Sequence, residues 1–255
     1  ADGLFSWEDF APVDPDPRVD FNGNNSADVL SRYTESGWLS YRDGGDQSIV
    51  DIGFPYGSEI VAVGDFDGDG EDDTLLEWES GWRAFQSSAN GAITDIGFGY
   101  GSTVIGIGDF DGDGEDDTLL EYESSEWFSI QRSGSGATTD IGFQNGYDLV
   151  GIGDFDGDGE DDVLLNFTST GWHRYLSSGD ANAAVELGFI TDTVIGIDDF
   201  DGDGLDDLLL QNGSNGVSYA SAGVLANSTF VGDYTGQEIL GQDLGTNTAD
   251  DMLIA

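Results

Sequence analysis

The chain of 255 residues has no cysteine, no lysine, one histidine and six arginines, against 52 acidic residues. The lack of cysteine excludes disulfides and thiolate metal sites, and a single histidine leaves zinc without its usual ligands. The formal net charge of −46 at pH 7 repels nucleic acid and anionic lipid, so neither is an expected partner. No apolar run is long enough to span a membrane, so membrane insertion is not expected.

The chain does contain one acidic motif, which repeats along its length. GDFDGDGEDD occurs three times and the variant DDFDGDGLDD occurs once. We number each copy from its first loop aspartate, and these aspartates are spaced by 44, 45 and 45 residues: Asp65, Asp109, Asp154 and Asp199. A fixed period of this size indicates several copies of one supersecondary unit.

This acidic motif has the chemistry of a calcium-binding loop. Carboxylates at positions 1, 3, 5 and 9 can point inward at one ion, position 7 can offer its backbone carbonyl, and glycines allow the tight turn. The predicted ligands are Asp65, Asp67, Asp69, Glu71 and Asp73; Asp109, Asp111, Asp113, Glu115 and Asp117; Asp154, Asp156, Asp158, Glu160 and Asp162; and Asp199, Asp201, Asp203, Leu205 and Asp207. Magnesium is the weaker candidate because it prefers a small octahedron and keeps its waters.

An EF-hand is the alternative calcium loop, and position 12 argues against it. An EF-hand requires a bidentate Glu there, whereas this chain has leucine in all four copies: Leu76, Leu120, Leu165 and Leu210. The residues that follow position 9, such as TLLEWE, are short apolar and aromatic runs typical of strands. We therefore expect each loop to join two strands.

Two weaker copies extend the repeat. One period before Asp65 the chain has the same loop with two amides in place of carboxylates: Asp20, Asn22, Asn24, Ser26 and Asp28. One period after Asp199 it has Asp243, Asn247 and Asp251, with Gly245 at position 3. The sequence thus predicts six repeats and four to five calcium ions.

Each repeat reads as four short strands. In the second repeat the expected strands are residues 60–64, 73–79, 81–85 and 92–98. Four strands per repeat of this length indicate an all-β β-propeller, with six four-stranded blades (seven is the alternative) in a single domain over residues 1–255. Residues 3–10 align with the fourth strand at residues 91–98, so the N- and C-terminal strands are expected to pair and close the ring. A third strand for that blade has no counterpart, so either the blade has three strands or the natural chain continues beyond Ala255.

The repeat with its GDFDGDGEDD loop resembles the FG-GAP/VCBS repeat of integrin α-subunit propellers and bacterial surface proteins. The Phe-Gly pair is Phe98-Gly99 here, and the resemblance covers nearly the whole chain. It implies structural calcium loops on one rim of the disc and ligand binding on the opposite face. The chain departs from the integrin pattern in having six recognisable repeats in place of seven.

These features favour a secreted or cell-surface binding or adhesion module, a part of a larger extracellular protein, with a carbohydrate or protein ligand. Calcium loops of modest affinity suit an extracellular calcium supply. An aromatic column at one repeat position could stack on sugar rings: Trp38, Trp82, Trp127 and Trp172. Burial between blades is the competing interpretation of these tryptophans. Arginines close after them could hold acidic groups of a glycan: Arg83, Arg132 and Arg174.

We do not expect this protein to be an enzyme. His173 lacks a partner nucleophile and is expected to be an exposed strand residue, and the acidic pairs recur with the repeat, as a solvated strand face would: Glu77, Glu79, Glu121 and Glu123. A polysaccharide lyase or hydrolase on a propeller scaffold is the alternative, since paired carboxylates can cleave glycosides. A spacer without a ligand of its own is the third possibility.

Overall fold

The computed structural model describes most of the chain from residue 19 onward. The described residues are 19–33, 36–53, 55–99, 101–122, 125, 127–143, 146–167, 169–177, 183–190, 192–212, 216–221, 229–233, 239–242 and 252–254. The predicted closing strand at residues 3–10 and the loop positions Asp243, Gly245, Asn247 and Asp251 lie outside them. Every regular element among the described residues is a β-strand, and none of these residues belongs to a helix that could cross a membrane.

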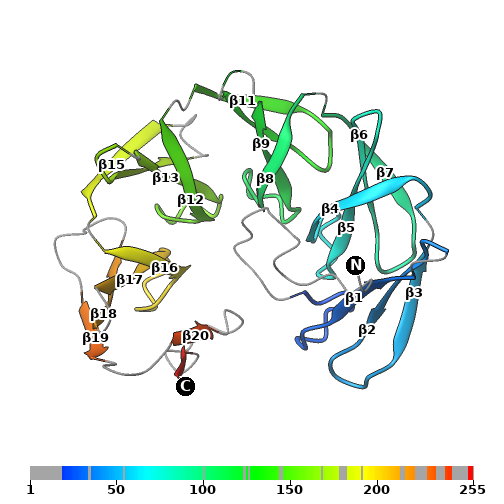
Figure 1. The fold of residues 1–255 in the computed structure, drawn as a ribbon, viewed down its shortest axis with the longest axis horizontal. Helices are drawn as coiled ribbons and strands as arrows, with labels where there is room; N and C mark the ends of the chain where they lie inside the picture. Colours follow the sequence, from blue (N-terminus) through cyan, green and yellow to red (C-terminus); the bar gives the residue numbers. More distant parts are fainter. Residues whose placement is uncertain are drawn as a thin grey trace. The chain divides into compact units, whose positions relative to one another are not determined.

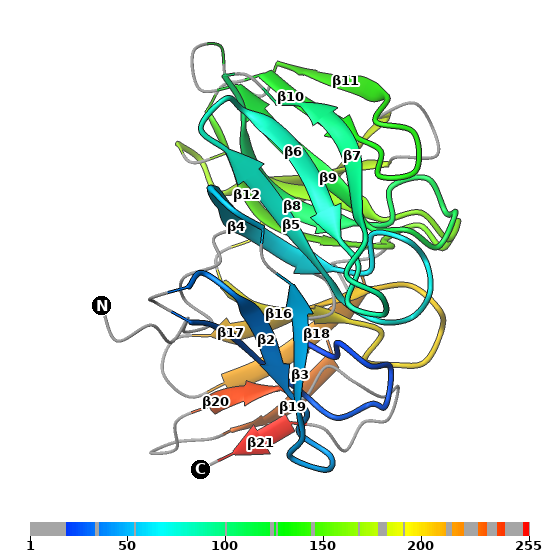
Figure 2. The same ribbon diagram turned by 90° about the vertical axis from the view of Figure 1, so that its right-hand side faces the viewer.

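Four antiparallel sheets have four strands each, and in each sheet every strand pairs with the next one along the chain (Figures 1 and 2). Their strands are β4 (Ser58–Gly64), β5 (Asp73–Trp78), β6 (Trp82–Gln86) and β7 (Ile93–Phe98); β8 (Thr103–Gly108), β9 (Asp117–Tyr122), β10 (Trp127–Gln131) and β11 (Thr138–Phe143); β12 (Tyr147–Gly153), β13 (Asp162–Phe167), β14 (Trp172–Ser177) and β15 (Ala183–Phe189); and β16 (Thr193–Asp198), β17 (Asp207–Asn212), β18 (Gly216–Ser221) and β19 (Thr229–Asp233). The four strands expected for the second repeat are β4 to β7.

Two smaller sheets come from the ends of the chain. The first contains β1 (Val29–Arg32), β2 (Leu39–Arg42) and β3 (Ile49–Gly53), and the last contains β20 (Ile239–Gln242) and β21 (Met252–Ile254). The residues one period before β4 are 13–19, and residues 13–18 lie outside the described part of the chain. Among the described residues the last sheet has two strands.

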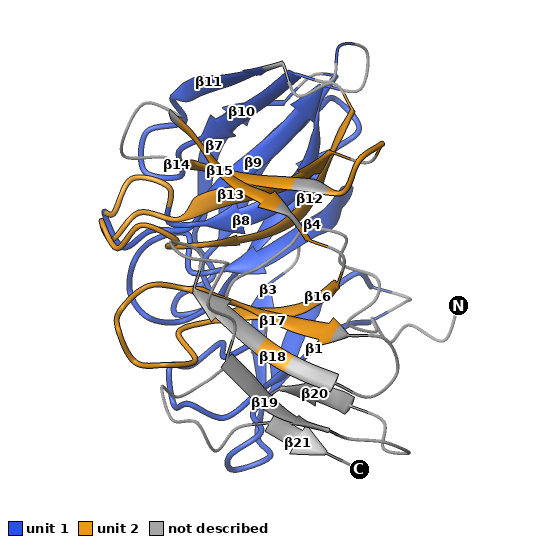
Figure 3. Ribbon diagram, turned by 90° about the vertical axis from the view of Figure 1, so that its left-hand side faces the viewer, with its two compact units in different colours: residues 1–109, 113–143 blue, residues 110–112, 144–255 orange. Residues whose placement is uncertain are grey.

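The chain forms two compact units, which Figure 3 colours separately. Unit 1 contains residues 1–109 and 113–143, and unit 2 contains residues 110–112 and 144–255. Unit 1 therefore holds the sheets β1–β3, β4–β7 and β8–β11, and unit 2 holds β12–β15, β16–β19 and β20–β21.

Within unit 1 the middle sheet is packed on both faces. Leu75 and Leu76 follow one another in β5 and are both 0% exposed, although neighbouring side chains of a strand point to opposite faces. Leu75 belongs to a core cluster with Phe66 and with Ile107 of β8. Leu76 belongs to a second cluster, which includes Leu30 of β1 and other side chains of the first sheet. Stacking of successive sheets therefore explains why the second strands are apolar at consecutive positions.

Candidate metal sites

Each of the four complete acidic loops connects the first and second strands of its sheet. In the second repeat β4 ends at Gly64 and β5 begins at Asp73, and these two residues are partners across the antiparallel pair. The same pairing joins Gly108 to Asp117 and Gly153 to Asp162. The strand–loop–strand geometry confirms the interpretation that distinguished this loop from an EF-hand.

The aspartate at position 1 is the centre of the hydrogen-bond network of each loop. In the second repeat the backbone N–H of Asp69 donates to Oδ1 of Asp65 at 3.1 Å, and the N–H of Gly70 donates to its Oδ2 at 2.8 Å. The donation from position 6 recurs in the other described loops at 2.6–3.0 Å, toward Asp20, Asp109, Asp154 and Asp199. These bonds fix the first carboxylate without using all of its lone pairs.

Position 6 requires a left-handed backbone, which explains its glycine. The backbone φ angle is +83° at Gly70 and between +85° and +86° at Gly114, Gly159 and Gly204. The first loop places Asn25 there with a φ of +63°, which asparagine tolerates better than most residues. Position 5 closes the turn, because its side-chain oxygen accepts the N–H of position 7, as Asp69 does from Glu71 at 3.0 Å.

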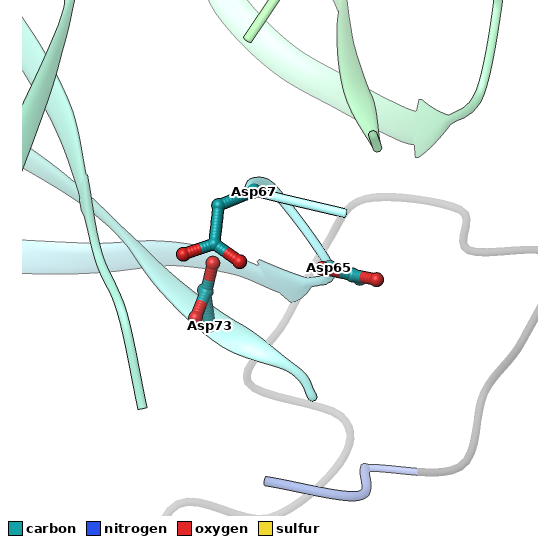
Figure 4. Close-up of side chains that lie close together, drawn as sticks. All are labelled: Asp65, Asp67 and Asp73. Carbon is teal, nitrogen blue, oxygen red and sulfur yellow. The ribbon is translucent and has the colours of Figure 1, made fainter. Parts of the chain in front are cut away.

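The carboxylates of each of the four complete loops converge. In every loop three aspartates have a carboxylate oxygen within 4.8 Å of the other two: Asp65, Asp67 and Asp73; Asp109, Asp111 and Asp113; Asp154, Asp156 and Asp162; and Asp199, Asp201 and Asp203. Figure 4 shows the first of these groups, with the carboxylates of Asp67 and Asp73 facing one another. At about 4 Å and an effective dielectric of 20, two such charges repel by about 4 kcal/mol, so the group favours a cation or protons.

The strongest evidence for a cation site in this loop comes from Asp73. Its side chain is 0% exposed, its Oδ1 accepts the N–H of Ser88 at 2.9 Å, and its Oδ2 has no hydrogen-bond partner. Burial, reinforced by the charges of Asp67, Asp69 and Asp65, raises the pKa of Asp73 to about 8. A buried carboxylate oxygen without a donor, on a side chain that lies among other carboxylates, fits a hard oxygen-preferring cation such as Ca²⁺.

The fifth loop shows the same electrostatics. Asp207 at its position 9 is 0% exposed, and burial raises its pKa to about 7, with further contributions from the charges of Asp201, Asp203 and Asp199. The carboxylates of Asp73 and Asp207 are therefore charged at neutral pH only if a nearby positive charge compensates their negative charge. Divalent calcium is such a compensating charge.

The first loop is folded like the others but has fewer charges. Asp28 is buried at position 9, where its oxygens accept the N–H of Phe21 and of Gly44, each at 2.9 Å. Burial raises the pKa of Asp28, although these two bonds oppose the shift. With Asn22, Asn24 and Ser26 between its two aspartates, this loop offers oxygen ligands of lower total charge. A weaker calcium site therefore stays a prediction here, as does calcium binding by the carbonyls of position 7.

The aromatic column lies at the ends of the sheets that are remote from the loops. Trp127 pairs across the sheet with Tyr122, the last residue of β9, whereas the loop leads into the first residue of that strand. Trp38, Trp82 and Trp127 are 37–40% exposed, so burial between sheets describes them only in part. Trp82 donates from Nε1 to Asp95 at 3.0 Å and lies 6.5 Å from the Phe98 ring, centroid to centroid. The side chain of Trp172 lies outside the described part of the structure.

The arginines near the tryptophans have partners within the protein. Arg83 is 0% exposed and donates to Glu77 at 2.6 Å and to the carbonyl of Ser102 at 2.8 Å, so the expectation that it could hold a glycan acid is wrong. Arg132 forms an ion pair with Asp117 at 3.3 Å. Arg174 lies over the ring of Tyr147, 4.1 Å from its centroid.

His173 is buried, which corrects the expectation of an exposed strand residue. It is 5% exposed, its Nδ1 lies 3.0 Å from the carbonyl oxygen of Gly171, and burial lowers its pKa. Glu77 also differs from a simple solvated residue, because its carboxylate pairs with Arg83. Sequence reasoning missed both points because the position after the tryptophan differs in each repeat: it holds Arg83, the partner of Glu77, in one and His173 in another.

No protein-family model and no curated protein matches this chain. Several solved structures of β-propeller proteins are similar to it. BBS1N in complex with ARL6DN has a TM-score of 0.52 at 11% identity, over 96% of this chain and 88% of that one. Virginiamycin B lyase from Staphylococcus aureus has a TM-score of 0.52 at 11% identity, over 92% and 72%. YCF48 bound to D1 peptide has a TM-score of 0.50 at 9% identity, over 84% and 68%. These similarities show that the chain has a propeller-like all-β fold.

Proposed function

We propose that this protein is a secreted, calcium-stabilised β-propeller of the FG-GAP/VCBS type that acts as a binding or adhesion module at a cell surface. Its six repeats form six blades, and pairing of the N- and C-terminal strands closes the ring. Calcium fills the four complete loops and, with lower affinity, the first loop. The ligand is a carbohydrate or a protein surface, and the chain is part of a larger extracellular protein.

The single observation that carries the calcium assignment is the buried oxygen of Asp73. Asp73 belongs to a group of three aspartates that have oxygens within 4.8 Å of one another, and its Oδ2 has no hydrogen-bond partner. In this loop Asp65, Asp67, Asp69 and Asp73 would hold the ion through carboxylates and Glu71 through its carbonyl. Calcium accepts six to eight oxygens in flexible geometry, so waters can complete its coordination.

Partly exposed tryptophans support a ligand surface at the opposite ends of the sheets. Tryptophan offers a large rigid face for stacking on sugar rings or for contact with a protein, and a surface repeated in each sheet would bind with avidity. Burial of Arg83 argues against acidic groups as the main determinant of the ligand. Neutral glycans or basic protein segments suit the strongly acidic chain better.

Glycan-array and protein-array binding of Trp82→Ala tests the proposed surface. We expect binding to fall while the circular dichroism spectrum and calcium-loaded melting temperature stay unchanged. The matched control is Ile93→Ala, because Ile93 is 48% exposed on β7 and pairs with Gln86 at the loop end of the same sheet. Equal binding of the wild type and Trp82→Ala would refute the role of this column.

Binding, and not catalysis, is the role we propose. Incubation with polysaccharides, followed by assays for new reducing ends and for unsaturated products, separates it from the lyase or hydrolase alternative. Binding without product formation is the expected result. Turnover of any polysaccharide would replace the proposal with an enzymatic one.

A further inference from the structure

Successive loops are held together by a reciprocal pair of hydrogen bonds that involves position 8, an aspartate outside the predicted ligand set. The backbone N–H of Asp65 donates to Oδ2 of Asp116 at 2.8 Å, and the N–H of Asp116 donates to the carbonyl of Asp65 at 2.6 Å. Asp116 belongs to the third loop, so it holds the first ligand residue of the loop before it. We call this arrangement the cross-loop pair.

The cross-loop pair recurs in both units. In unit 1 the N–H of Asp20 donates to Oδ2 of Asp72 at 2.6 Å, and the N–H of Asp72 donates to the carbonyl of Asp20 at 3.0 Å. In unit 2 the N–H of Asp154 donates to Oδ2 of Asp206 at 2.8 Å, with the return bond also at 2.8 Å. Three occurrences with the same atoms make the pair a property of the repeat.

In the fifth loop the N–H of position 1 donates to a different aspartate. Its position 1 is preceded by Asp198, where the second, third and fourth loops have glycine, and the N–H of Asp199 donates to Oδ1 of Asp198 at 2.8 Å. The backbone of position 1 thus receives a carboxylate in either case. At the other end of the series, position 8 of the first loop is Ala27, which has no carboxylate to offer.

A second contact joins the same neighbours. A Cβ atom at Gly68, position 4 of its loop, would lie 3.1 Å from the carbonyl oxygen of Gly114 and 3.2 Å from Cγ of Glu115. Gly23 and Gly112 meet positions 6 and 7 of the following loop in the same way, whereas a Cβ at Gly202 of the fifth loop would have no atom within 4 Å. The first and second loops therefore each touch the following loop at two points on their ligand-bearing backbone.

We propose that the position-8 aspartates are positioning residues that couple calcium binding in neighbouring loops. This inference rests on the proposed calcium binding. Asp116 lies between two predicted ligands of its own loop, the carbonyl of Glu115 and the carboxylate of Asp117, so calcium in that loop fixes its backbone. The cross-loop pair then fixes the backbone of Asp65, the first ligand residue of the preceding loop, before an ion arrives there. By linkage, calcium in the preceding loop favours binding in the following one to the same extent.

The test follows calcium binding loop by loop in the full chain, with CaCl₂ as the only ligand. The amides of Gly70 and Gly114 donate to the position-1 carboxylates of the two loops, so their NMR signals report calcium in each loop separately. Asp116→Ala removes the acceptor, and Asp116→Asn keeps an oxygen acceptor. Asp51→Asn is the matched control, because it also changes an aspartate to asparagine, at an exposed position on β3 outside the loops.

We expect Asp116→Ala to raise the calcium midpoint at Gly70 about tenfold, within the 5–150-fold range typical of coupled sites, although every ligand of that loop is intact. Asp116→Asn should restore most of the affinity, and Asp51→Asn should leave the Gly70 midpoint unchanged. An unchanged Gly70 midpoint in Asp116→Ala would overturn the coupling while leaving calcium binding itself in place. If calcium does not change the Gly70 and Gly114 amide signals of the wild-type protein, the proposed function is overturned instead. If Asp116→Ala does not fold, Asp206→Ala with Gly159 as reporter applies the same criterion in unit 2.

Discussion

Replacement of Asp73 by asparagine separates its role as a metal ligand from its role in the fold. Asparagine has nearly the same shape, and its side-chain oxygen can still accept the N–H of Ser88, as Oδ1 of Asp73 does at 2.9 Å. Without calcium at pH 7 the carboxyl is largely protonated, because burial raises its pKa to about 8. The neutral amide therefore replaces a neutral acid, and we expect the melting temperature in EDTA to change little.

With calcium present the same substitution should be costly. A site saturated at 100 times its dissociation constant stabilises the folded state by about 2.7 kcal/mol. For domains of 150–250 residues, 1 kcal/mol corresponds to a melting-temperature shift of about 2–4 °C. Loss of the Asp73 site should therefore lower the calcium-loaded melting temperature by about 5–10 °C.

Thermal melts followed by circular dichroism, with and without calcium, measure both quantities. Asp51→Asn is the control, because it removes one acidic charge from an exposed position on β3. Its melting temperature should match that of the wild type in both conditions. An equal fall of Asp73→Asn in EDTA and in calcium would show that Asp73 is structural, and would refute its assignment as a ligand.

Three further outcomes follow from the buried groups. Because burial raises the pKa of Asp73 to about 8 and of Asp207 to about 7, the folded calcium-free protein holds protons that the unfolded chain has released. The free energy of unfolding of the calcium-free protein should therefore fall between pH 5 and pH 8. Calcium binding near pH 7 should release protons, which calorimetry in buffers of different ionisation enthalpy measures. Binding without proton release would contradict these pKa shifts. Phe66→Ala should cost about 3–5 kcal/mol in urea unfolding, because Phe66 is 0% exposed in the core, and a cost below 1 kcal/mol would contradict that packing. Arg83→Ala should lower the free energy of unfolding by about 2–3 kcal/mol in the same assay. This is less than the 3–5 kcal/mol typical of breaking a fully buried ion pair, because the Glu77 side chain is 31% exposed. No measurable change would mean that the pair is not formed in solution.

The repeat and its strands could be predicted because their determinants are local. Alternating aspartates and glycines fix the turn, and apolar runs on either side of it fix the strands, so the boundaries of β4 to β7 lie close to the expected ones. Interactions between repeats were harder to foresee. Asp72 and Asp73 are adjacent aspartates at the end of GDFDGDGEDD, and only Asp73 was a predicted ligand. No pattern in the sequence indicated that Asp72 would hold the neighbouring loop.

The phenylalanine of the loop is another feature that the sequence interpretation left out. Position 2 lies between two polar ligand positions and is nevertheless 0–1% exposed in Phe21, Phe66, Phe110 and Phe155. An apolar residue at a fixed place in an otherwise acidic loop was the available signal, since only burial explains it. Arg83 and His173 gave no comparable signal, because their burial depends on the strands and loops around them.

The number of calcium ions bound by the full chain tests the central claim most directly. Equilibrium dialysis against millimolar calcium, with metal analysis of the protein compartment, should give four to five ions per chain, and Asp73→Asn should bind one fewer. A protein that retains no calcium under these conditions would contradict the assignment of the acidic loops as metal sites.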